Sequence, residues 1–161
     1  QIDGKQALFE SNAIAEYLDE TTTPRLHPED PIARAHNRAW TDYVPTFASS
    51  VTGCAYAATE AEYQKAVAKI PEAFDRLEKA LEKQGSGPFF NGARYSLVDA
   101  AYAPFLQRYL FLDRIKKIGQ LENYPRLKAW TEAIMKRPST HFFPEAEFEA
   151  MYQTNVKRRN S

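Results

Sequence analysis

The spacing of apolar residues along the chain predicts a mainly helical protein. From residue 31 onward apolar side chains return every three or four positions, which is the pattern of an amphipathic helix that buries one face. A first stripe contains Ile32, Trp40, Tyr43, Val44, Phe47, Val51 and Cys54, and a second contains Tyr63, Val67, Ile70, Phe74, Leu77 and Leu81. Because Pro45 and Pro71 lie inside these segments, we expect a kink near Thr41 in the first helix and an interruption in the second.

A third segment, residues 97–112, is apolar or aromatic almost all round the helical wheel. A helix of that kind belongs at the centre of a bundle. Ser96 and Asp99 stand at its start with the spacing of a capping box, in which each side chain bonds the other residue's backbone N–H. Because a buried helix start without a cap would leave unsatisfied donors, we interpret this pair as structural rather than catalytic.

Two shorter helices complete the pattern. One begins near Pro125, carries apolar residues on one face to Ile134, and stops before Pro138. The other begins at Pro144 and carries Phe148 and Met151. We therefore predict an all-α domain over residues 31–161.

The first thirty residues have a different character. Asp3-Gly4 predicts a tight hairpin turn, followed by a strand from Lys5 to Phe9 and a short helix from Ser11 to Asp19. Residues 21–30 form a proline-rich connector, so we place residues 1–20 in a separate unit. Only two residues precede the turn, too few for the partner strand, and we expect the natural polypeptide to extend further upstream.

Composition and charge then narrow the functional classes. The 21 Lys and Arg residues balance the 21 Asp and Glu residues, so no overall field attracts nucleic acid or an anionic membrane. The basic end, Lys157 to Arg159, is interpreted as a solvated terminus. No apolar run approaches the roughly 20 residues that span a bilayer. A single cysteine excludes an internal disulfide, and we expect a cytoplasmic protein.

The sequence contains no residue pattern typical of a metal-binding site or of a catalytic nucleophile. His27, His36 and His141 are scattered without metal-ligand spacing, so we expect no metal. Cys54 lies on the apolar stripe of the first long helix, and we interpret it as a small buried hydrophobe rather than a nucleophile.

Four segments are distinctive through their order and separation: ALFESNAIAEYLDE, ARAHNRAW, YSLVDAAYAPFLQR and NYPRLKAWTEAIMKRPS. Together they resemble the cytosolic glutathione transferase family, over residues 1 to about 138. The resemblance implies that the chain is the C-terminal portion of such a protein. Residues 1–20 would be the last strand and helix of a thioredoxin-like domain, residues 21–30 the linker, and residues 31–161 the all-α domain.

The resemblance assigns a role to the junction between the predicted strand and the first helix. A helix N-terminus offers free N–H donors and a partial positive charge, which suits a carboxylate. In the family the γ-glutamyl end of glutathione docks there. By position, Ser11 would donate to the α-carboxylate and Glu10 would accept from the α-ammonium. The alternative is that Ser11 is only an N-cap and Glu10 only a favourable acid at a helix start.

For a second substrate, an electrophile, the resemblance implies a pocket walled by the all-helical domain. Tyr43, Phe47 and Tyr109 are candidates, because amphipathic aromatic side chains suit a site for flat molecules. The same residues are equally what a bundle core needs, so both alternatives stand. No residue can be assigned the thiol-activating role of the family, and we expect the 161-residue chain to be inactive alone and monomeric or aggregating.

The sequence therefore predicts a glutathione transferase, or its C-terminal portion, with glutathione as substrate and a small electrophile as partner. The whole protein would conjugate glutathione to the electrophile or carry out a glutathione-dependent reduction, as a homodimer. A non-catalytic docking or stress-response module of the same fold is the alternative, because fold alone does not decide function. The Glu10-Ser11 pair favours the enzyme.

Overall fold

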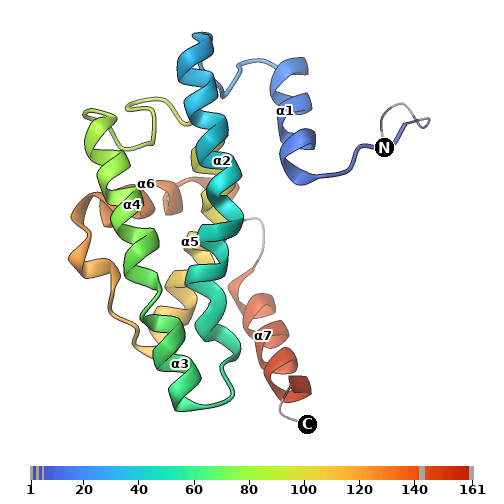
Figure 1. Ribbon diagram of the computed structural model, residues 1–161. Helices are drawn as coiled ribbons and strands as arrows, with labels where there is room; N and C mark the ends of the chain where they lie inside the picture. The colour runs from blue at the N-terminus through green and yellow to red at the C-terminus, as the bar shows by residue number, and fades with distance from the viewer. Residues whose placement is uncertain (1, 3, 5, 142–143, 160–161) are drawn as a thin grey trace.

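The computed structural model describes residues 2, 4, 6–141 and 144–159. Over these residues the fold is helical, with the longer helices arranged as a bundle (Figure 1). In chain order the helices are α1 (Ser11–Thr21), α2 (Pro31–Thr52), α3 (Glu60–Val67), α4 (Ile70–Lys83), α5 (Leu97–Lys116), α6 (Pro125–Met135) and α7 (Glu145–Arg159). Short 3₁₀ turns lie at Gly53–Tyr56, Leu121–Asn123 and Pro138–His141.

Helix α5 lies at the centre of the bundle, as its apolar sequence predicts. It forms the most extensive helix pair with α2, while α6 packs against both α4 and α5. Its fully buried side chains include Val98, Tyr102, Leu106 and Tyr109. The prediction of an all-helical bundle from residue 31 onward is therefore confirmed, with this helix extending to Lys116.

Aromatic rings fill the space between these helices. The ring of Phe74 on α4 lies 6.2 Å from that of Phe47 on α2 and 5.1 Å from that of Tyr109 on α5. Trp130 on α6 lies 5.4 Å from Tyr102 and 6.0 Å from Phe90. Stacked, edge-to-face and tilted pairs at these distances add stabilisation beyond the apolar area that they bury.

Pro45 and Pro71, the prolines that the sequence places within the first two stripes, have different effects. Helix α2 continues through Pro45 as one element from Pro31 to Thr52. The second segment is divided: α3 ends at Val67 and α4 begins at Ile70, with Pro71 in its first turn. A proline is tolerated there because the first N–H groups of a helix have no intrahelical acceptor. The predicted interruption is confirmed.

The prediction of a strand from Lys5 to Phe9 is not borne out over the residues that the structure describes. Asp3 and Lys5 lie outside those residues. Ile2 and Gln6 form one antiparallel bridge around Gly4, whose φ is 68°, and residues 7–9 that follow are irregular. A strand needs a hydrogen-bonded neighbour, and residues 7–9 have none among the described residues.

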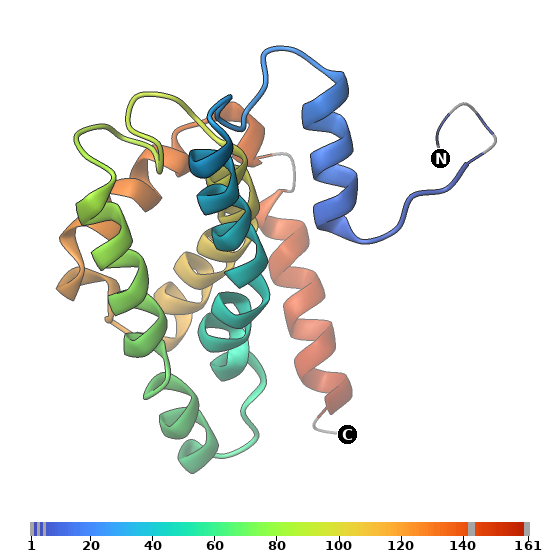
Figure 2. The same ribbon diagram turned by 45° about the horizontal axis from the view of Figure 1, so that its top comes forward.

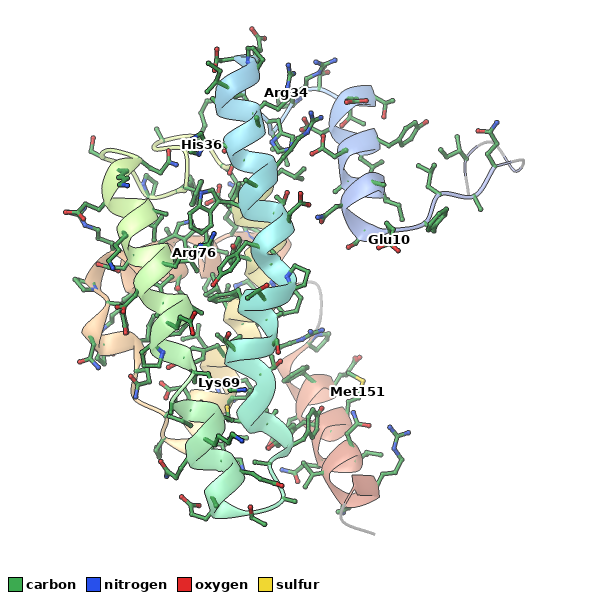
Figure 3. All side chains as sticks on the ribbon, viewed as in Figure 1. Glu10, Arg34, His36, Lys69, Arg76 and Met151 are labelled. Atoms are coloured by element: carbon green, nitrogen blue, oxygen red, sulfur yellow. The ribbon has the colours of Figure 1, made fainter. Side chains whose placement is uncertain are left out.

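Helix α1 stands beside the bundle rather than within it. Figures 1 and 2, which differ by a 45° rotation, both place α1 and α7 on the same side of the bundle. In Figure 3, the start of α1, marked by Glu10, is its lower end, on the side toward α7. This side of the molecule therefore carries both the start of α1 and helix α7.

Candidate functional site

The start of α1 has an unusual backbone. Glu10 is the N-cap residue, with φ 66° and ψ 120°, and within the described part of the chain no side chain caps the helix. A non-glycine residue at positive φ is strained by roughly 1–3 kcal/mol, and such residues cluster at functional sites. Ser11 is the first helical residue, and both side chains are exposed. The capping alternative for Ser11 is thus not supported, because Glu10 occupies that position.

This geometry leaves donors available for a ligand. The first N–H groups of a helix have no intrahelical acceptor and carry a partial positive charge. Ser11 adds a hydroxyl beside them, and Glu10 adds a carboxylate. Chemically, the arrangement can hold a carboxylate at the N–H groups with an ammonium group close to it.

A charged network attaches α1 to the bundle. The Glu16 carboxylate accepts from Arg38 Nε at 3.0 Å and contacts His27 Nε2 at 2.7 Å. Asp19 accepts from the backbone N–H of Leu26 and His27 in the connector. At the beginning of the helix, Asn12 Nδ2 donates to Asp42 Oδ1 of α2 at 2.9 Å. Together these bonds hold α1 against the connector and α2, and the Asn12–Asp42 bond places the start of α1 beside the middle of α2.

Sequence reasoning missed this network. The sequence assigns His27 no role, yet this connector residue is 3% exposed and packs against α1 through Glu16. Its partner Glu16 is eleven residues away, and Arg38 is twenty-two residues from Glu16, so no local spacing relates them. Only the turn of the connector brings them together.

We predict that the attachment of α1 weakens in acid. Burial alone would raise the pKa of Glu16, but the hydrogen bonds from Arg38 and His27 outweigh it, and the pKa of the carboxyl lies below its ordinary value of 4.5. A group whose pKa is lower in the folded than in the unfolded state stabilises the folded form at pH values above its unfolded-state pKa. This stabilisation is lost as the pH falls through the folded-state pKa. Proteolysis of the connector should therefore accelerate below about pH 4.5. Glu16→Gln should remove most of that pH dependence; an unchanged profile would contradict the assignment.

Ser96 and Asp99 form the predicted capping box at the start of α5. The Asp99 carboxylate accepts from the Ser96 N–H at 2.7 Å, and the Asp99 N–H donates back to Ser96 Oγ at 3.5 Å. Asp99 also accepts from the Phe90 N–H at 2.8 Å and from Trp130 Nε1 at 2.6 Å. It is completely buried, so its role is to satisfy the donors around it.

The three aromatic candidates for an electrophile pocket occupy different environments. Phe47 and Tyr109 are completely buried in the core, which fits the core alternative for both. Burial also raises the pKa of Tyr109, so its phenol stays neutral. Tyr43 is half-buried at the edge of α2, where the guanidinium of Arg76 lies 4.2 Å from its ring centre. The structure does not bring these three side chains together around a cavity.

A cavity of about 530 Å³ lies instead between α5 and the C-terminal segment. Its apolar lining includes Pro104, Leu110 and Phe111 of α5 together with Phe148 and Met151 of α7. Arg108 and Arg114 of α5, also in the lining, project charged side chains. We refer to this space as the α5–α7 cavity. Figure 3 shows Met151 on the same side of the bundle as Glu10.

The sequence offered no means of placing this cavity. It depends on where α7 returns along α5, and α7 was predicted only as a short helix. Tyr152 fixes that position: its hydroxyl donates to the carbonyl of Ala55 at 2.9 Å, and its ring lies 5.5 Å from that of Phe111.

The other candidate groups lie elsewhere. Cys54 is fully buried, and burial raises the pKa of its thiol, which fits a small core side chain. His36 is exposed, and the ring of His141 bonds the carbonyl of Met135. Among the described residues, no three His, Cys, Asp or Glu side chains are grouped so as to hold a metal ion. None of the described helices is long and apolar enough to cross a bilayer.

Comparison with known proteins relates this fold to one family. Residues 60–133 match the family described as "Glutathione S-transferase, C-terminal domain". Glutathione S-transferase L1 of Arabidopsis thaliana is 33% identical over 153 residues, which is 93% of this chain and 60% of that protein. The chain thus spans about three fifths of the length of this relative.

Solved structures agree with the sequence matches. The tau-class glutathione S-transferase MiGSTU from mango superposes with a TM-score of 0.76 at 27% identity, covering 92% of this chain and 71% of that one. Rice GST1, solved in complex with glutathione, gives a TM-score of 0.77 at 26% identity, covering 94% and 71%. The chain therefore belongs to the glutathione S-transferase family, and its helical bundle is the C-terminal domain of that family.

Proposed function

We propose that the protein is a glutathione transferase in which the start of α1 binds the γ-glutamyl end of glutathione. Ser11, with the free N–H groups around it, donates to the α-carboxylate, and Glu10 accepts from the α-ammonium. The whole protein conjugates glutathione to an electrophile or carries out a glutathione-dependent reduction. Residues 1–20 belong to its glutathione-binding unit, residues 21–30 are the linker, and residues 31–161 are the helical domain.

The observation that carries the proposal is the uncapped start of α1 with Glu10 at positive φ. Backbone strain of this kind is retained where the surroundings impose it. The N–H groups meet the negative end of the zwitterion and the Glu10 carboxylate meets the positive end. A glutathione-bound relative, rice GST1, supports glutathione as the ligand.

The α5–α7 cavity is the second part of the proposed site, as the place for the electrophile. Its volume is within the roughly 300–1,000 Å³ typical of small-molecule sites. Helix α7, which contributes Phe148 and Met151 to its lining, lies on the side of the bundle that carries α1 (Figure 2). We propose no thiol-activating residue within this chain. The whole protein is proposed to act as a homodimer.

The test compares two fragments of glutathione on the whole protein as its gene encodes it. γ-Glutamylcysteine retains the zwitterionic end, whereas cysteinylglycine lacks it. If the start of α1 recognises that end, γ-glutamylcysteine should displace glutathione in a calorimetric competition, and cysteinylglycine at the same concentration should not. The physical reason is that only the first fragment carries an ammonium and a carboxylate on the same carbon, close enough together to meet Glu10 and Ser11, whereas in cysteinylglycine a peptide unit separates the two charges.

Equal competition by the two fragments would contradict the proposed recognition. A whole protein that binds no glutathione would favour the docking-module alternative instead. Turnover of glutathione with a chromogenic electrophile, measured on the same preparation, completes the test.

A further inference from the structure

A second cavity, of about 490 Å³, lies between α1, the connector of residues 21–30 and the beginning of α2. We refer to it as the connector cavity. Its lining is polar and contains three arginines from the connector and α2, together with three carboxylates from the second half of α1. Figure 3 labels one of the arginines, Arg34, on the side of α2 that faces α1. Because Glu10 and Ser11 lie at the opposite end of α1, the connector cavity is separate from the proposed glutathione site.

The three carboxylates of the lining are engaged within the protein to different degrees. Glu16 accepts from Arg38 Nε at 3.0 Å and lies 2.7 Å from the ring of His27. Asp19 accepts from two backbone N–H groups of the connector. Glu20 has only Arg38 near it, at 3.6 Å, and its side chain is 64% exposed. Two of the three negative charges are therefore already compensated by groups of the protein.

Two arginines of the lining, Arg25 and Arg34, have no carboxylate partner among the residues that the structure describes. Arg25 donates to the backbone carbonyl of Glu20 at 3.3 Å, and this neutral acceptor leaves its charge uncompensated. The side chain of Arg34 is half-buried and makes no hydrogen bond within the described part of the chain. The planar N–H groups of a guanidinium match the spacing of phosphate oxygens, so two such groups on one cavity favour a phosphate.

A buried nitrogen in the wall of the connector cavity also has no partner. His27 belongs to the lining, and its Nδ1 atom is buried without a hydrogen bond to any group that the structure describes. The other ring nitrogen is engaged by Glu16. Because buried polar atoms are normally hydrogen-bonded, an unpaired one in a cavity wall is typical of a place that a polar molecule occupies.

We infer that the connector cavity binds phosphate, either as the free ion or as the phosphate group of a small ester. The N–H groups of Arg25 and Arg34 donate to its oxygens. Because Arg25 belongs to the connector and Arg34 to α2, the bound anion joins these two segments and strengthens the attachment of α1 to the bundle. This goes beyond the proposed glutathione binding and does not depend on it.

The experiment titrates inorganic phosphate and glycerol 3-phosphate into the whole protein, in the absence of glutathione, and follows binding by calorimetry. We expect saturable binding, and chloride at the same ionic strength should not compete. Arg34→Gln should weaken phosphate binding about 10-fold, because a half-buried guanidinium makes charge-assisted hydrogen bonds. Arg25→Gln removes an exposed guanidinium and should weaken it about 2- to 5-fold. Binding of the ester alone would identify an ester as the ligand, whereas equal binding of both probes would identify the phosphate group by itself.

Matched variants test the chemistry of the site. Arg34→Lys keeps the charge but loses the planar N–H groups, so it should weaken binding less than Arg34→Gln does. Glu20→Gln removes the least compensated carboxylate of the lining and should strengthen phosphate binding. Arg126→Gln removes an exposed arginine of α6, outside the cavity, and should change nothing. Circular dichroism of each variant checks that the helices are retained.

Proteolysis of the connector gives a second readout. A ligand that binds only the folded arrangement stabilises it, so phosphate should slow cleavage of residues 21–30 in the unchanged protein and have less effect in Arg34→Gln. The inference is overturned if neither phosphate probe binds the unchanged protein saturably. Equal phosphate affinity in the Arg25→Gln, Arg34→Gln and Arg126→Gln variants would overturn it as well, because the bound anion would then lie elsewhere.

Discussion

Replacing Asp99 by alanine is expected to lower the free energy of unfolding by about 4–6 kcal/mol. The carboxylate is completely buried and accepts from the N–H groups of Phe90 and Ser96, the Ser96 hydroxyl and the indole of Trp130, all within 2.8 Å. Each buried donor left without an acceptor costs roughly 1–3 kcal/mol, and the Ser96 hydroxyl can turn to another acceptor. Because several donors lose their acceptor together, the loss of stability is larger than for an ordinary substitution.

Urea unfolding followed by circular dichroism measures the effect. Ser96→Ala removes only the hydroxyl half of the capping box and should cost about 1 kcal/mol. Glu82→Ala, at an exposed carboxylate near the end of α4, is the matched control and should change stability by less than about 0.5 kcal/mol. An Asp99→Ala variant no less stable than Ser96→Ala would show that the remaining bonds contribute little.

Asp99 also shows how far sequence can predict a structure. The capping box was predicted because its two residues are three apart, and local spacing determines the geometry of a helix start. The bonds from Phe90 and Trp130 to Asp99 could not be predicted in this way, because those residues are 9 and 31 positions away. Only the packing of α6 brings the indole of Trp130 close to Asp99. The helices from residue 31 onward are predictable for the same local reason, because the spacing of apolar residues indicates which face of each helix is buried.

The candidate site was predictable only in part. The junction at Glu10 and Ser11 was found from a resemblance, whereas the positive φ of Glu10 has no indication in the sequence. Aromatic residues on an apolar stripe gave two alternatives for Phe47 and Tyr109, because a core and a pocket need the same side chains. The α5–α7 cavity depends on tertiary docking of α7, and no periodicity specifies where a helix docks.

Replacing Ser11 by alanine in the whole protein is expected to weaken glutathione binding by about 10- to 150-fold. A hydrogen bond to a charged group contributes roughly 1.5–3 kcal/mol, and each 1.4 kcal/mol is a factor of ten in affinity. Calorimetric titration with glutathione measures the change. From the sequence alone, a loss of stability would accompany it, because Ser11 could be an N-cap.

The structure separates these two effects. Glu10 is the N-cap residue and Ser11 is already inside α1, so Ser11→Ala should leave the free energy of unfolding within about 0.5 kcal/mol. Ser49→Ala makes the same change at an exposed position of α2 and should alter neither quantity. Unchanged glutathione affinity in Ser11→Ala would contradict the binding role. Lower stability with unchanged affinity would assign Ser11 a structural role, because the loss of a contact within the fold affects folding whereas the loss of a ligand contact affects only the bound state.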